Sequence, residues 1–422
     1  VDKKYRYLPL YSVSGLWRIS QEPFMASAKW IDNLVVRASY GLQGNIDKNT
    51  SPFLLGNYRI ENILPGGSED MIDVSGAPNK KLRWEKTHSV NAGFDFAVLN
   101  QAINLSVDYY YRKGVDLIGT QMLPLETGFE MLTVNWASMR NQGVEVALST
   151  RNVHTKNFMW TTNFNFAYNN NKVLKEALRE DALEPGREGY PAGALFALKT
   201  AGLDEEGYPM FQDKDGKAVS AMEFFKLQEW GFGATDLTAR ERRELYTYVG
   251  TADCPYTGGF NNTFTYKAFE LGVNFSFDFG GKVRSQPTYS IVDFDKGRNT
   301  NRDILNRWTP ENTETIFPVL LSQNERLDEY MWYSNQNEIY RNLDIWIRDL
   351  NYVRLQNIRL GYTLPTNFTR TLGMTSATVA IEGRNLLVFG SSYKNYLDPE
   401  TMSNAYATPA PKSVTLSLNL IF

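Results

Sequence analysis

Hydrophobic and polar residues alternate along many stretches of about ten residues. In 412–422, apolar side chains at every second position from Val414 to Phe422 alternate with threonine, serine and asparagine. In 269–279, six large apolar side chains alternate in the same way with residues that include Glu270 and Asp278. A period of two is that of a β-strand whose faces meet different surroundings. The pattern predicts eleven such strands, at 5–19, 33–45, 87–99, 102–113, 140–150, 157–170, 257–266, 269–280, 351–363, 377–388 and 412–422.

The two faces of the predicted strands differ in chemistry. One face carries charged residues, asparagine and threonine, and the other carries large aromatics where sandwich cores more often mix smaller aliphatic residues. Aromatic residues also gather near strand ends, as at Tyr109–Tyr111, Trp160 and Phe422, which is typical of membrane-interface girdles. This pattern favours a membrane β-barrel, although a soluble β-sandwich would also place polar residues outward.

The links between the predicted strands are alternately short and long. The short ones are 20–32, 100–101, 151–156, 267–268 and 364–376. The long ones are 46–86, 114–139, 171–256, 281–350 and 389–411. Outer-membrane barrels have short turns on one side and long loops on the other, so the links favour the barrel over the sandwich.

Three local features refine this prediction. The alternation in 351–363 changes phase, which predicts a bulge near Gln356–Asn357. The strand-like segment Tyr190–Ala201 would break the alternation of links, so we place it inside the loop 171–256. Residues 236–246 predict a short helix in the same loop.

Composition excludes several classes of protein. The 44 basic and 47 acidic residues give a formal net charge of −3, which argues against a nucleic-acid binder. No apolar run approaches the roughly 20 residues of a membrane-spanning helix. One cysteine, Cys254, and two histidines, His88 and His154, exclude a disulfide framework and a multi-histidine metal site, and we expect no cofactor.

No pattern of residues points to an enzyme. The sequence from Asp213 to Gly216 is faintly similar to a calcium loop, but it lacks the later glutamate and is better interpreted as a hairpin turn. Pairs of acidic residues such as Glu205 and Glu206 are expected by chance among 47 carboxylates. We therefore expect no catalytic residues and no metal site.

A series of motifs resembles the C-terminal half of a SusC/RagA-type TonB-dependent outer-membrane transporter of Bacteroidetes. The series runs through nearly the whole chain in one order, which makes it far more specific than any single motif. It includes Val36–Asn45, Leu82–Thr87, Asn91–Phe96, Val107–Lys113, Gly143–Glu145, Tyr256–Asn262, Phe279–Lys282, Arg307–Asn312, Leu355–Pro365, Gly383–Leu386 and Asp398–Glu400.

The resemblance implies a 22-stranded barrel, of which residues 1–422 would supply about half. Eleven strands cannot close a bacterial barrel, which has an even number, and no signal peptide opens at Val1. We therefore expect a longer protein that supplies further strands, a plug and a TonB box. The resemblance also implies an outer-membrane location, a TonB complex that acts through the missing N-terminal part, a SusD-like surface lipoprotein partner and often a dimer of such pairs.

Candidate functional residues lie mainly in the long loops. Exposed aromatics can stack on sugars or pack against peptides, so we take Trp230, Trp332, Tyr333 and Trp346 as candidate substrate-binding residues. The alternative is that loop aromatics pack the loops against one another. The resemblance implies that Phe422, at the end of an apolar alternating strand, is part of the signal for assembly into the outer membrane.

Other residues have predicted roles in the barrel wall and the fold. Charged side chains on the polar face are expected to contact the plug or line the transport path, and they are Arg112, Glu145, Glu270, Asp278 and Arg359. Trp84 and Trp308, within motifs of the series, are expected to determine the fold.

The sequence thus predicts TonB-dependent import of a large nutrient, with glycans as the first substrate class and oligopeptides as the second. The two largest loops, 171–256 and 281–350, are the expected docking surface for the lipoprotein. A soluble secreted β-rich protein that binds or degrades carbohydrate is the alternative, and a purely structural barrel is a third possibility.

Overall fold

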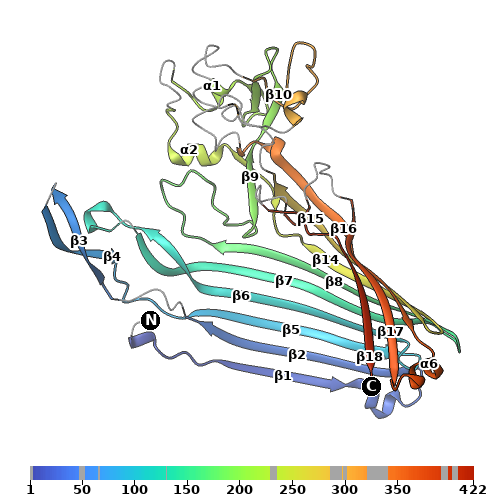
Figure 1. The fold of residues 1–422 in the computed structure, drawn as a ribbon. Helices are drawn as coiled ribbons and strands as arrows, with labels where there is room; N and C mark the ends of the chain where they lie inside the picture. Colours follow the sequence, from blue (N-terminus) through green and yellow to red (C-terminus); the bar gives the residue numbers. More distant parts are fainter. Residues whose placement is uncertain are drawn as a thin grey trace.

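The main element of the protein is one antiparallel sheet of eleven strands that curls as it is followed from β1 to β18 (Figure 1). The computed structural model describes residues 3–46, 53–64, 67–129, 131–228, 235–285, 297, 302–320, 341–390, 398–401 and 407–422. The sheet strands are, in spatial order, β1 (Tyr11–Arg18), β2 (Ile31–Asn45), β5 (Glu85–Val98), β6 (Ile103–Met122), β7 (Met131–His154), β8 (Phe158–Lys175), β14 (Tyr256–Tyr266), β15 (Phe269–Arg284), β16 (Ile347–Thr363), β17 (Ser376–Phe389) and β18 (Ser413–Ile421). These are the eleven strands predicted by the alternation.

Strand register aligns the apolar positions of different strands into continuous rows. One such row, here called the apolar row, crosses ten strands without a polar residue. It consists of Trp17, Val36, Phe94, Val107, Val146, Phe166, Gly258, Phe277, Val353 and Phe389. Several of these side chains are exposed, including Trp17 at 53% and Phe389 at 51%. Large apolar side chains exposed in a continuous row match a sheet whose outer surface meets lipid.

The predicted bulge is present in β16. Leu355 pairs with Phe275 and Asn357 pairs with Asn274, so Gln356 is the extra residue on its strand. The register toward β17 shifts at the same place, but there β17 carries the extra residue, because Leu355 pairs with Leu387 and Asn357 pairs with Arg384. Because side chains alternate with a period of two, the extra residue returns both halves of β16 to the apolar face of the sheet.

Several predicted strand boundaries were wrong. The first strand was expected to start at residue 5 but begins at Tyr11. The loop expected at 114–139 is largely strand, because β6 and β7 continue to pair as far as Met122 and Met131. The pairing shifts at Gly114–Leu117, and this irregularity hid the strand from a search for strict alternation. Backbone pairing with the neighbouring strand maintained the hairpin where the side-chain pattern faded.

The long loops carry elements of their own. β3 (Leu55–Leu64) and β4 (Gly67–Gly76) form a separate hairpin. β9 (Ala194–Leu198) pairs with β13 (Tyr246–Thr251), and β10 (Thr200–Leu203), β11 (Pro209–Gln212) and β12 (Ala218–Val219) form a small sheet. The helices are α1 (Ala221–Phe224), α2 (Ala239–Glu244), α6 (Thr366–Thr371) and the 3-10 turns Lys3–Tyr5, Ile19–Gln21, Pro23–Met25, Leu125–Thr127, Arg302–Asn306 and Asp344–Trp346. Among the described residues, no helix has the length and hydropathy needed to cross a membrane.

The predicted loop elements in 171–256 are confirmed. β9 lies within Tyr190–Ala201 and belongs to the loop and not to the large sheet. α2 lies within 236–246 and starts with a capping box, in which Thr238 and Glu241 exchange hydrogen bonds between side chain and backbone. The segment from Asp213 to Gly216 is the turn between β11 and β12, as predicted.

The two largest loops meet in a hydrophobic core beyond one end of the sheet (Figure 1). We call this unit the loop module and define it as residues 194–251, 302–320 and 341–346. Its buried residues come from both loops and are Leu198, Phe211, Val219, Ala221, Phe224, Phe225, Leu343 and Trp346. A shared core of this kind holds long loops in a defined shape.

Candidate functional site

The face opposite the apolar row is polar and lines the inside of the curled sheet. A second row, here called the charged row, lies one position along from the apolar row. It carries Arg37, Asp108, Glu145 and Asp278, with the uncharged Gly93, Ala167 and Thr257 on the strands between them. The Arg37 Nη2 atom lies 2.7 Å from Asp108 Oδ2 and 3.2 Å from Asp95 Oδ1. One guanidinium thus bridges carboxylates from two further strands, and it ties β2 to β5 and β6 across the polar face.

The charged residues predicted for the inner wall lie on this face. The Arg359 guanidinium donates to Glu270 Oε1 at 2.9 Å, which joins β16 to β15. Asp278 accepts a hydrogen bond from the Tyr352 hydroxyl. Arg112 lies with its guanidinium 5.4 Å from the centre of the Tyr110 ring. These contacts place the side chains on the wall, while their predicted contact with a plug stays a prediction.

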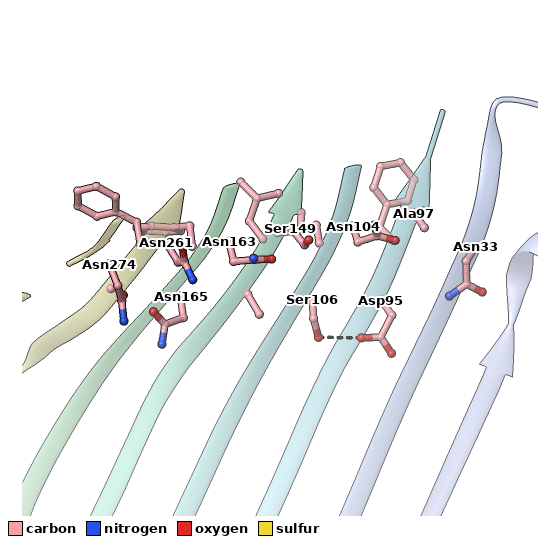
Figure 2. A pocket seen from close by; sticks show the side chains of 17 residues that line it. Asn33, Asp95, Ala97, Asn104, Ser106, Ser149, Asn163, Asn165, Asn261 and Asn274 are labelled. Carbon is pink, nitrogen blue, oxygen red and sulfur yellow. Dashed lines mark hydrogen bonds between the residues drawn. The ribbon is translucent and has the colours of Figure 1, made fainter. Parts of the chain in front are cut away.

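A second row on the polar face is made almost entirely of uncharged amides. It crosses the sheet in the order Asn33, Ala97, Asn104, Ser149, Asn163, Asn261, Asn274 and Asn357. The row lies along a hollow of about 440 Å³, and Figure 2 shows its amide groups on adjacent strands. Small residues line the same hollow at Ala147 and Gly259.

This amide row offers donors and acceptors without net charge. The Asn261 Oδ1 atom is buried and has no hydrogen-bond partner among the described residues, so the row has unused acceptor capacity. The alternation in the sequence predicts asparagine on the polar face, as at Asn163 and Asn274, but it does not indicate that the asparagines of different strands align. The alignment depends on the register of eight strands. A shift of one residue in the pairing of a strand would move its side chains to the other face of the sheet.

A buried charge cluster joins the last long loop to the inner wall. Arg354, on β16, has a side chain only 2% exposed and forms an ion pair with Asp398, which is 6% exposed. Its Nε atom also donates to Glu400 Oε1 at 2.9 Å. The Tyr352 hydroxyl, which donates to Asp278, also lies 3.3 Å from Glu400 Oε1. We call this group the Arg354 pin, and it fixes residues 398–401 against the polar face.

The loop side of the pin is itself well ordered by hydrogen bonds. Asp398 Oδ1 accepts from the backbone N–H of Glu400 at 3.1 Å, and Oδ2 accepts from that of Ala410 at 3.2 Å. Burial works to raise the pKa of the Asp398 carboxyl, but hydrogen bonds from Arg354 and these N–H groups outweigh it and hold the pKa below its usual range. The carboxylate is therefore ionised and paired at neutral pH. Sequence reasoning recognised Asp398–Glu400 as a motif but assigned it no partner.

The candidate substrate-binding aromatics are only partly placed. Trp346 is 1% exposed and belongs to the core of the loop module, so the expectation that it offers a ring to a substrate is wrong. Its ring packs near Phe317, as expected if loop aromatics hold the loops together. Trp230, Trp332 and Tyr333 lie outside the described residues. Phe422 follows β18 and is 80% exposed, and its role in assembly stays a prediction.

The other singled-out residues have structural contacts. The Trp308 ring lies 2.4 Å from the position that a Cβ atom would take at Gly207, and its backbone N–H donates to Phe317. Trp84 donates from Nε1 to the Arg6 carbonyl at 3.1 Å. His88 shares a hydrogen bond of 2.8 Å with the Tyr40 hydroxyl. Among the described residues, no group of three or more histidine, cysteine or acidic side chains could hold a metal ion.

A curled antiparallel sheet with an apolar outer row and a polar inner face defines the wall of a membrane β-barrel. Comparison with known proteins agrees with this class. Residues 3–194 match the family model described as TonB dependent receptor-like, beta-barrel. The chain is 26% identical over 451 residues to TonB-dependent receptor P3 of Formosa agariphila, covering all of this chain and 42% of that protein. It is 25% identical to TonB-dependent receptor SusC of Bacteroides thetaiotaomicron, covering 99% of this chain and 40% of that protein.

A solved structure shares the fold. The RagAB peptide importer in its closed-closed state superposes with a TM-score of 0.75 at 23% identity, covering 99% of this chain and 44% of that one. The chain is thus similar to a segment of the outer-membrane β-barrel of TonB-dependent receptors such as SusC, and the likeness to RagAB is one of fold. These comparisons confirm the resemblance noted in the sequence. It spans about two-fifths of the length of the curated relatives it matches.

Proposed function

We propose that the protein to which this chain contributes imports a nutrient too large for porins across the outer membrane, with energy supplied through TonB. The observation that carries the proposal is the two-faced sheet. Its apolar row fits lipid, and its polar face carries charged and amide rows that suit a water-filled path or a plug. The relatives are named as receptors of the same TonB-dependent type.

The chain is proposed to form the C-terminal half of the barrel. Both edge strands, β1 and β18, have exposed residues throughout. An open edge leaves backbone N–H and C=O groups unpaired, which the hydrocarbon region of a membrane does not tolerate. Further strands from the rest of the protein would pair with these edges and close the wall.

A SusD-like lipoprotein is the proposed partner at the cell surface, and dimers of such pairs are the proposed assembly. The loop module is the proposed docking surface, because it lies beyond the end of the sheet and has a core of its own (Figure 1). A rigid surface loses less conformational entropy on binding than a set of separate loops. The relative named RagAB is described as a peptide importer and SusC as a TonB-dependent receptor.

The experiment uses the full-length protein in its own host. A strain that lacks the gene is complemented with the wild-type protein or with a variant that lacks only the TonB box, and growth is measured on glycans and on peptides. The proposal expects growth on at least one of these nutrients with the wild-type protein and none with the variant, at equal amounts of both proteins in the outer membrane. Growth that is the same with both proteins would contradict transport and favour a structural barrel. Recovery of the protein in the soluble fraction would favour the secreted alternative.

A further inference from the structure

The loop module contains a cavity that the barrel wall does not share. Its volume is about 740 Å³, which lies within the roughly 300–1,000 Å³ range typical of sites for small ligands. The cavity lies among the turn after β11, α1, α2 and the start of β13. Its lining residues are Lys199, Gln212, Asp213, Lys214, Val219, Glu223, Phe224, Lys226, Leu237, Glu241, Glu244, Leu245 and Thr247.

The apolar part of the cavity is built from the core of the module. Val219, Phe224 and Leu237 are 3%, 8% and 8% exposed, and the first two belong to the shared core. Their positions are therefore set by packing and do not depend on a ligand. A site whose floor is already formed loses little free energy in ordering when it binds.

The polar parts of the wall are also held in place. The Asp213 carboxylate accepts from the backbone N–H of Asp215 at 3.0 Å and of Lys217 at 2.7 Å, which fixes the turn after β11. The capping box between Thr238 and Glu241 fixes the start of α2, which also lines the cavity. Hydrogen bonds thus hold two parts of the cavity wall in place.

The charges that line the cavity are of both signs and close to balance. Lys214 pairs with Glu244 at 3.0 Å and Lys226 pairs with Glu241 at 3.5 Å. All four side chains are at least 43% exposed, and ion pairs this exposed are worth about 0–1 kcal/mol. A charged ligand can therefore replace these ion pairs with its own contacts to the same side chains at little cost in free energy.

Two further charges in the cavity are available for a ligand. Among the described residues, the Lys199 ammonium and the Glu223 carboxylate have no ion pair. The Lys199 ammonium is a positively charged hydrogen-bond donor and the Glu223 carboxylate is a negatively charged hydrogen-bond acceptor, and both residues line the cavity. This pair would complement a ligand that carries a carboxylate at one place and an ammonium at another.

Neutral sugars fit this chemistry less well. Sugar rings are commonly bound against the open faces of aromatic side chains, but Phe224, the aromatic residue in the described lining, is 8% exposed and packs in the core. A neutral ligand would also leave the rim charges without new partners. A short peptide with free termini has both charges and an apolar or polar body between them.

We propose that this cavity is a capture site for short peptides with free termini, in which Lys199 contacts the terminal carboxylate and Glu223 contacts the terminal ammonium. The inference rests on the proposed import function, for which it names the oligopeptide class in place of the glycan class ranked first from the sequence. It assigns the capture step to the loop module, outside the barrel wall.

The test uses the full-length protein purified in detergent with any lipoprotein that co-purifies. Isothermal titration calorimetry measures the binding of a defined tripeptide with free termini, of the same peptide with both termini blocked, and of maltotriose. An extended tripeptide spans about 10 Å, which suits a cavity of this volume. The variants are Lys199→Gln and Glu223→Gln. Matched controls are Lys217→Gln and Glu205→Gln, two exposed residues of the same module that do not line the cavity.

Lys199 and Glu223 are exposed, and exposed charge pairs contribute little, so each cavity variant is expected to weaken binding of the free peptide about two- to fivefold. Blocking both termini should weaken binding more than either variant does. The control variants should bind the free peptide as the wild-type protein does, and maltotriose should show no binding to this cavity. Unchanged binding in both cavity variants, equal binding of the blocked peptide, or no peptide binding at all would overturn the inference. If one of these results is found but uptake still depends on TonB, the inference about the cavity fails and the proposed transport function stands. If peptide binding is intact but uptake does not depend on TonB, the proposed transport function fails and the inference about the cavity stands.

Discussion

Replacing Arg354 with methionine should release the last long loop from the inner wall. The Arg354 side chain is 2% exposed and forms ion pairs with Asp398, which is 6% exposed, and with Glu400. Methionine keeps much of the volume but removes the charge, so Asp398 would remain buried without its ion-pair partner. Removing one partner of a buried ion pair costs about 3–5 kcal/mol.

The loop can avoid that cost by detaching, because Asp398 then regains water. The equilibrium between pinned and detached loop should shift toward detachment by roughly 10²–10⁴-fold, since each 1.36 kcal/mol is a factor of ten. Two short described segments, 398–401 and 407–411, flank the pin and report on it. The assay is hydrogen exchange of these segments in the full-length protein in detergent, with limited proteolysis of the same loop as a second readout.

Arg359→Met is the matched control. Arg359 is on the same strand and the same face, but its pair with Glu270 is 37% and 52% exposed and should contribute only about 0–1 kcal/mol. The double variant Arg354→Met, Asp398→Asn should recover part of the protection, because it no longer buries an unpaired charge. Protection of 398–401 in Arg354→Met equal to that of the wild-type protein, or equal loss of protection in Arg359→Met, would refute the reasoning.

Three further predictions follow from the same contacts. Because the pKa of Asp398 is lowered in the folded protein, its stabilising contribution is complete above the ordinary aspartate range and is lost as the pH falls from that range through the lower folded pKa. The protection of 398–401, corrected for the intrinsic exchange rate at each pH, should therefore stay constant from pH 8 to 5 and fall below about pH 4. Gly207→Ala should destabilise the loop module by more than about 1 kcal/mol, because Gly207 has φ +86° and a Cβ atom there would meet the Trp308 ring. Unchanged hydrogen exchange of the core amides in the module would contradict this prediction. Deletion of Phe422 should lower the amount of folded protein in the outer membrane without changing its synthesis, which quantitative immunoblots of membrane and total fractions would measure.

The barrel wall was predictable because the physical constraint acts on neighbouring residues. Lipid on one side and water on the other impose a period of two on each strand, so 269–280 could be recognised without any knowledge of its partners. Even the bulge at Gln356 left a local signature, since it changed the phase of the alternation. The extension of β6 to Met122 was missed because its support is the pairing with β7 and not its own pattern.

The site was less predictable because it depends on contacts between distant segments. Arg354 and Asp398 are 44 residues apart, and nothing near either residue indicates that they are buried together. Trp346 looked like a free loop aromatic, but it packs with residues such as Phe211, which lies in the other large loop. A hydrophobic residue in a long loop has the same local sequence whether it faces a ligand or a core.

The central claim is that the sheet separates lipid from a watery interior, and labelling of adjacent residues tests it most directly. Nitroxide labels would be attached to Val107→Cys and Asp108→Cys, with Cys254→Ser and any further cysteine of the full-length protein replaced, in reconstituted membranes. Val107 is in the apolar row, and Asp108 contacts Arg37 on the polar face. The account predicts that the label at 107 is relaxed mainly by oxygen dissolved in lipid and the label at 108 mainly by a water-soluble nickel chelate. Equal access of the chelate to both labels would contradict a membrane wall at this strand.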